Sequence, residues 1–102
     1  MQNTIERYTH SVSKLVPQGI EYSEHAKVRK QQRGIKDWWV SIVLDYGNYE
    51  YQNGKHTYSI SLNKASLKSI KRTFGKLVDI EKLRRLYVIM SEDSVVITCA
   101  YR

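Results

Sequence analysis

Three polar side chains stand at helical spacing in the first third of the chain. His25, Arg29 and Arg33 are four residues apart, so an α-helix places them in one ridge on one face. Histidine takes and gives protons near neutral pH, and arginine forks match the oxygens of a phosphate group. The ridge therefore predicts proton transfer and charge stabilisation at a phosphodiester. A solvated helix face is the alternative interpretation of the same spacing.

A hydroxyl lies within the apolar run that ends the chain. Strand alternation puts Thr98 on one side with Val96 and Ala100, and puts Cys99 on the other side. Thr98 either contacts a scissile phosphate or is an ordinary strand residue, because threonine is a good strand former. Cys99 has no basic sequence neighbour to activate it, so we expect a buried, inert thiol.

The pair Asn53-Gly54 predicts a β-hairpin with a two-residue turn. In that register Tyr51 faces His56 and Tyr49 faces Tyr58. His56 is then either a second general acid or a hydrogen-bonding partner of Tyr51. The neighbouring Lys55 points to the opposite side of the strand, so at most one of the two can face a substrate.

Positive charge is concentrated in the second half of the chain. The chain has 17 Lys and Arg against 10 Asp and Glu, a net charge of +7 and a pI of about 9.6. Nine of the cations lie between residues 55 and 85, where Asp79 and Glu81 are the two acids. A basic stretch of this kind is typical of a nucleic-acid surface. The residues we expect to contact nucleic acid are Lys64, Lys68, Lys71 and Arg72.

Capping residues and apolar spacing predict three helices. The first spans residues 23–33, with Ser23 as its cap and Gly34 as its end. The second spans residues 37–46 and the third follows Asn63 up to residue 74. The second helix carries an apolar stripe that should pack on the core, formed by Trp39, Ile42, Val43 and Tyr46.

The remaining segments predict a sheet. Residues 86–90 and 94–101 are nearly continuous in apolar character, which indicates central strands covered on both faces. We therefore expect an α+β fold, with two N-terminal helices packed on a mainly antiparallel sheet of about four strands and a third helix between the hairpins. Residues 1–21 should form a loosely ordered extension, and residues 22–102 a single domain.

Composition narrows the class of protein. A chain of 102 residues has no room for a separate cofactor domain, so we expect no cofactor. There is one cysteine, no Cys/His cluster with zinc-ligand spacing and no compact Asp/Glu cluster, so we expect no disulfide and no metal. No run of 18 apolar residues and no signal-peptide core is present. These features predict a cytoplasmic protein without a membrane partner.

Four short motifs lie along the chain: His25-Ala26 with Arg29, Arg33-Gly34-Ile35, Val43-Leu44 with Gly47, and the ending Val96-Ile97-Thr98 through Tyr101-Arg102. Together they resemble the pattern of a family of small uncharacterised bacterial domains related to the barnase, EndoU, colicin and RelE-like (BECR) ribonuclease fold. The resemblance covers residues 22–102 and implies a nuclease-like cleft between the first helix and the sheet. His25, Arg29, Arg33 and Thr98 match the polar positions of the family pattern. One extra residue separates Thr98 from Tyr101, which strand alternation turns away from it.

These observations favour a metal-independent, toxin-like endoribonuclease in which a 2′-hydroxyl attacks its own phosphate. His25 would transfer protons, Arg29 and Arg33 would clamp the transition state, and Thr98 would position the substrate. The alternative is a non-catalytic module that binds nucleic acid, with RNA favoured, or an acidic protein. A neutralising partner protein is compatible with the toxin-like interpretation.

Overall fold

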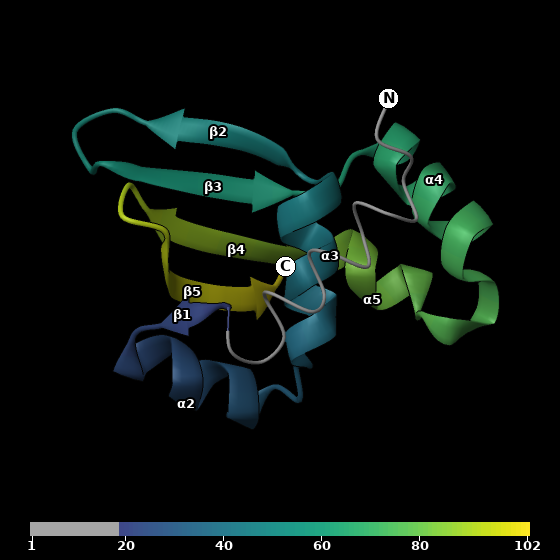
Figure 1. The fold of residues 1–102 in the computed structure, drawn as a ribbon, viewed down its shortest axis with the longest axis horizontal. Coiled ribbons are helices and arrows are strands. Elements are labelled where there is room, and N and C mark those ends of the chain that lie inside the picture. The colour runs from purple at the N-terminus through teal and green to yellow at the C-terminus, as the bar shows by residue number, and fades with distance from the viewer. Residues whose placement is uncertain (1–18) are drawn as a thin grey trace.

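Helices and strands mix along the part of the chain that this computed structural model describes, residues 19–102 (Figure 1). The predicted α+β class is confirmed. In chain order the elements are β1 (Glu21–Tyr22), α2 (Glu24–Gln32), α3 (Asp37–Tyr46), β2 (Asn48–Gln52), β3 (Thr57–Ser61), α4 (Lys64–Phe74), the 3₁₀ turn η1 (Gly75–Leu77), α5 (Ile80–Arg85), β4 (Leu86–Ser91) and β5 (Val95–Tyr101). The two elements η1 and α5 add to the three predicted helices.

The described strands form one mixed sheet of five, in the order β1-β5-β4-β3-β2. β1 runs parallel to β5, and the other neighbours are antiparallel. We expected about four strands, and the additional one is β1. Its two residues carry no periodic pattern, and they become a strand only because β5 lies beside them.

The apolar stripe of α3 covers one face of the sheet, as predicted. Trp39 is 8 % exposed and Ile42 is fully buried. They share one core cluster with Ile60 of β3 and Val88 of β4. Ala26 of α2 belongs to the same cluster, so both N-terminal helices pack on this face.

Side-chain caps explain where the helices begin. The Ser23 hydroxyl accepts a hydrogen bond from the Ala26 backbone N–H, and Asn63 Oδ1 accepts one from the Ser66 N–H. Such caps satisfy backbone donors that have no partner within the helix. Gly34 ends the first helix with a φ of +64°, a conformation that favours glycine. The sequence-based boundaries of α2 and α4 are therefore confirmed to within a residue.

The register of the β2–β3 hairpin differs from the predicted one. Tyr51 pairs with Tyr58 and Gln52 pairs with Thr57, so the loop holds residues 53–56 rather than two residues. His56 has a φ of +55° and therefore belongs to the turn. The shift is by two residues, so each side chain keeps its predicted face. The predicted strand pairing of His56 with Tyr51 is wrong, because the turn is longer than expected and includes His56 as well as Gly54.

A β-bulge changes the faces of β5. Thr98 pairs with Ile89 and Val96 pairs with Met90, which leaves Ile97 as the extra residue. Val96 therefore faces the core with Cys99, and both are fully buried. The prediction that Val96 shares a face with Thr98 is wrong, because strict alternation does not hold across a bulge.

The second face of the sheet lies outside the core. Thr98 shares this face with Ile89 and Ser59, which follow it across the sheet in register. In residues 19–102 the core cluster contains none of these three, and Ile89 and Thr98 stay partly exposed. β4 and β5 are central strands, as predicted. Within residues 19–102, α2 and α3 pack on the same side of the sheet, so the described helices do not provide the predicted coverage of both faces.

Residues 19–21 of the predicted extension belong to the described fold. Ile20 is 8 % exposed and belongs to the core, and Glu21 pairs with Val95 of β5. The rest of the predicted extension, residues 1–18, lies outside the described residues. Among the described residues, no helix combines the length and apolar character needed to span a bilayer.

Candidate nucleic-acid interface

Two hydrogen bonds fix the start of α2 against β5. The Ser23 backbone N–H donates to the Val96 carbonyl over 2.9 Å, and the Ser23 hydroxyl donates to the Ile97 carbonyl over 3.2 Å. His25 lies two residues beyond Ser23, and Thr98 lies one residue beyond Ile97. The start of α2 therefore lies close to the backbone of β5 just before Thr98. The Thr98 side chain itself points to the opposite face of the sheet from the one on which α2 packs, so the structure does not bring it together with the ridge.

The ridge residues are open to solvent. His25 and Arg33 are exposed, and Arg29 is partly exposed. Their side chains make no hydrogen bond or ion pair with any other described residue, and the same holds for Thr98. None of three hollows in the described surface is lined by these four residues. The structure thus leaves the ridge available to a ligand without enclosing it in a cleft.

His56 contacts Tyr51 through its side chain, although the two residues are not paired in the sheet. The Tyr51 hydroxyl lies 3.3 Å from His56 Nδ1 and donates a hydrogen bond of 2.6 Å to Glu92 Oε2. This carboxylate hydrogen bond raises the pKa of Tyr51. The three side chains join the tips of the two hairpins. The interpretation of His56 as a partner of Tyr51 is confirmed, whereas Glu92 was not predicted to take part.

A row of unpaired cations follows the outer surface of α4. Lys64, Lys68, Lys71 and Arg72 are all exposed, and none forms a salt bridge with a described carboxylate. The buried side of the same helix is anchored by Ile70. We call these four residues the α4 cationic surface. It lies at the opposite end of the molecule from the hairpin tips (Figure 1).

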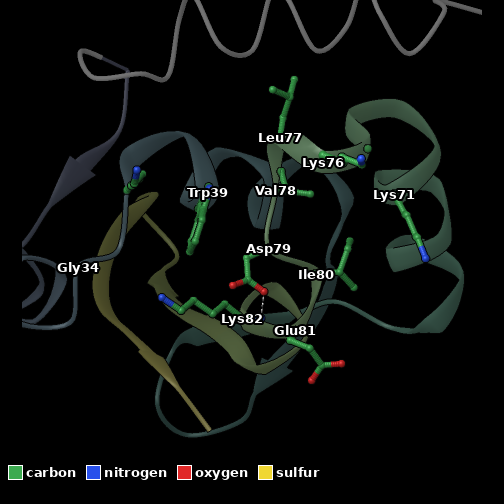
Figure 2. A pocket seen from close by; sticks show the side chains of 12 residues that line it. Gly34, Trp39, Lys71, Lys76, Leu77, Val78, Asp79, Ile80, Glu81 and Lys82 are labelled. Carbon is green, nitrogen blue, oxygen red and sulfur yellow. Dashed lines mark hydrogen bonds between the residues drawn. The ribbon is translucent and has the colours of Figure 1, made fainter.

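A groove of about 900 Å³ adjoins the α4 cationic surface. One wall is the turn between α2 and α3, which contributes Gly34 and Lys36. The other wall runs from Lys71 of α4 through η1 to Lys82 of α5. Figure 2 shows Trp39, Asp79 and Lys82 pointing toward one another in this groove.

The groove connects the two sets of residues singled out from the sequence. Gly34 in its first wall directly follows Arg33 of the ridge, and Lys71 in its second wall belongs to the α4 cationic surface. Lys36 was absent from the predicted site, since its neighbours in sequence carry no sign of the groove. Its position matters only because residues 34–39 and 71–82 meet in space.

Positive side chains outnumber negative ones in the lining of the groove. Lys36, Lys71, Lys76 and Lys82 make no salt bridge with a described residue. Asp79 Oδ1 accepts from the Lys82 backbone N–H and caps α5. Glu81 lies 2.7 Å from Arg84, and this guanidinium lowers the pKa of the Glu81 carboxyl. The groove therefore keeps an excess of lysine charge, whereas the charge of Arg84 is already paired.

Comparisons with protein-family models, curated proteins and solved structures found no match to this chain. Within residues 19–102, no three His, Cys, Asp or Glu side chains gather in a group that could hold a metal ion. The candidate site is therefore defined by its own residues. It consists of the α4 cationic surface, the adjoining groove and the α2 ridge, and neither the surface nor the ridge is paired with another described residue.

Proposed function

We propose that this protein binds nucleic acid, with RNA favoured, through the α4 cationic surface and the adjoining groove. The observation that carries the proposal is the row of exposed cations on α4, none paired with a described carboxylate. Protein carboxylates neutralise many surface lysines, whereas the α4 cations have no partner among the described carboxylates and can bind an external anion. The sequence resemblance to a ribonuclease fold supports RNA over DNA.

The physical basis is counterion release. A nucleic acid holds condensed cations along its phosphates, and each lysine that neutralises a phosphate sets one of them free. Four cations on one helix face, continued by Lys76 and Lys82, give a sequence-independent contact of this kind. Such a surface positions a strand, whereas specificity needs contacts with the bases.

Fluorescence anisotropy with a labelled RNA tests this proposal. We expect the double variant Lys68→Ala/Arg72→Ala to bind at least about tenfold more weakly than wild type at low salt. Lys27→Ala is the matched control, because Lys27 is also an exposed helix cation but is paired with Glu24 at 3.2 Å. Equal affinities of wild type and the double variant would contradict the proposal.

RNA cleavage is a second candidate function, favoured by the position of the α2 ridge. Ser23 holds the start of α2 beside Ile97, so the three ridge side chains begin next to the edge of the sheet and face solvent. In the proposed reaction a substrate 2′-oxygen forms a bond to phosphorus and the bond from phosphorus to the 5′-oxygen breaks. His25 transfers protons between these oxygens, while Arg29 and Arg33 stabilise the charge on the phosphate.

Incubation of the purified protein with RNA, with and without chelator, tests this second candidate. We expect products with a 2′,3′-cyclic phosphate end, the same rate with chelator, and no cleavage of a 2′-deoxy substrate that lacks the nucleophile. An intact RNA under all conditions would leave binding as the function.

A further inference from the structure

We propose that the groove between the α2–α3 turn and the η1–α5 segment takes an unpaired nucleobase, so that the preferred ligand is single-stranded RNA. The proposal rests on the proposed nucleic-acid binding and specifies which form of nucleic acid is bound. It is carried by the lining of the groove, which combines an apolar floor with a cationic rim.

The floor consists of apolar side chains from two distant segments. Trp39 of α3 and Val78 after η1 are each 8 % exposed, and Ile80 of α5 is partly exposed. All three line the groove. A phosphate gains nothing from such a floor, whereas the face of a nucleobase packs well on apolar and aromatic side chains.

The rim supplies the charge that a nucleotide needs. Lys36, Lys76 and Lys82 surround the floor from three elements, and none of them is in a salt bridge with a described residue. Figure 2 shows Lys82 reaching toward Trp39. A base on the floor would therefore have its phosphate within the reach of lysine side chains, which match a single phosphate as point charges.

The groove suits an unstacked base better than a duplex. Its volume of about 900 Å³ lies within the roughly 300–1,000 Å³ typical of small-ligand sites. Bases in a duplex are stacked and paired, so they cannot enter such a groove without being extruded. The α4 cationic surface contacts phosphates and accepts either form. Discrimination between single and double strands must therefore come from the groove.

The test compares one RNA sequence as a single strand and as a duplex. Affinities are measured by anisotropy at one salt concentration, and we expect wild type to bind the single strand about tenfold more tightly. Ile80→Ala should reduce this preference severalfold and leave duplex affinity unchanged. Val28→Ala is the matched control, since Val28 is an apolar residue 52 % exposed on α2, outside the groove lining. Thermal melting of each variant checks that it folds.

The outcomes separate this inference from the proposed function. Equal affinity of wild type for single strand and duplex, with both weakened in Lys68→Ala/Arg72→Ala, would overturn the groove proposal and keep nucleic-acid binding. The groove proposal would also be overturned if wild type bound the single strand more tightly than the duplex and both Ile80→Ala and Lys82→Gln kept the same preference. If wild type bound neither form of RNA, both proposals would be overturned.

Discussion

Tyr22 donates its hydroxyl proton to Asp37 Oδ1 over 2.9 Å. Lys30 Nζ lies 2.7 Å from the same oxygen and 5.1 Å from the centre of the Tyr22 ring. One carboxylate therefore joins β1, α2 and the first turn of α3. The turn between α2 and α3 is held at both ends by this contact, and the same turn forms one wall of the groove.

Removal of the Tyr22 hydroxyl should destabilise the domain. Tyr22→Phe leaves the ring in place but removes a hydrogen bond to a carboxylate, so we expect a loss of about 1–2 kcal/mol in the free energy of unfolding. Urea denaturation measures it. Tyr87→Phe is the control, because the Tyr87 hydroxyl makes no hydrogen bond with a described residue. Equal stability of the two variants would contradict this account.

The stability of the protein should fall in alkali. Burial raises the pKa of the Tyr22 phenol above its ordinary value of about 10, and the Asp37 carboxylate raises it further. The unfolded chain then loses this proton near pH 10 while the folded chain keeps it, so the free energy of unfolding decreases as pH rises above about 10. Urea midpoints between pH 8 and pH 11 measure the decrease, which should be smaller in Tyr22→Phe. A flat profile in wild type would refute this explanation.

Substitution of Gly47 should destabilise the protein, because the fold leaves no room for a Cβ atom at this position. Its φ of −78° suits any residue, but an added Cβ would lie 2.4 Å from the Val43 carbonyl oxygen and 2.7 Å from Ile60 Cγ2. We expect Gly47→Ala to cost about 1–3 kcal/mol, as overpacking usually does. Gly54→Ala is the contrasting variant, with a φ of +82° and no atom within 4 Å of the new Cβ. Its loss should be about 1 kcal/mol. A larger loss at Gly54 in denaturation experiments would reverse the argument.

RNA affinity should weaken steeply as salt rises. Each neutralised phosphate contributes a slope of about −0.7 to −0.9 to the plot of log affinity against log salt concentration. Lys68→Ala should therefore make the slope shallower by about one unit. Lys27→Ala should leave it unchanged. Affinity that does not depend on salt would exclude the α4 cationic surface as the contact.

His25→Ala should separate cleavage from binding if the second candidate function holds. Loss of a positioned proton-transfer group lowers a cleavage rate by about 10²- to 10⁴-fold, while RNA affinity should change little. Arg33→Ala should reduce both, since a guanidinium contacts the phosphate in the ground state and in the transition state. Rates come from gel-resolved products and affinities from anisotropy. If the His25→Ala variant cleaved RNA at the wild-type rate, His25 would be excluded from the mechanism.

Three of the described helices, α2, α3 and α4, could be predicted from local patterns, whereas η1 and α5 were not predicted. The caps Ser23 and Asn63, the glycines that follow, and the apolar stripe of α3 act between residues at most four positions apart. The ridge of α2 follows from the same short-range geometry, as does the exposed row of cations on α4. The α2 ridge and the α4 cationic surface both depend on residues that are close in sequence, so they can be predicted from the sequence.

The register of the sheet and the groove were decided by tertiary structure. The Asn53-Gly54 pair indicated a hairpin, but the turn also took in His56, and the bulge at Ile97 moved Val96 to the face of Cys99. Both changes depend on how strands from separate parts of the chain pack together. The groove likewise needs Trp39 of α3 beside Ile80 of α5, 41 residues later. Local sequence specifies which face of a helix is apolar or cationic, whereas only packing determines which other segment that face meets.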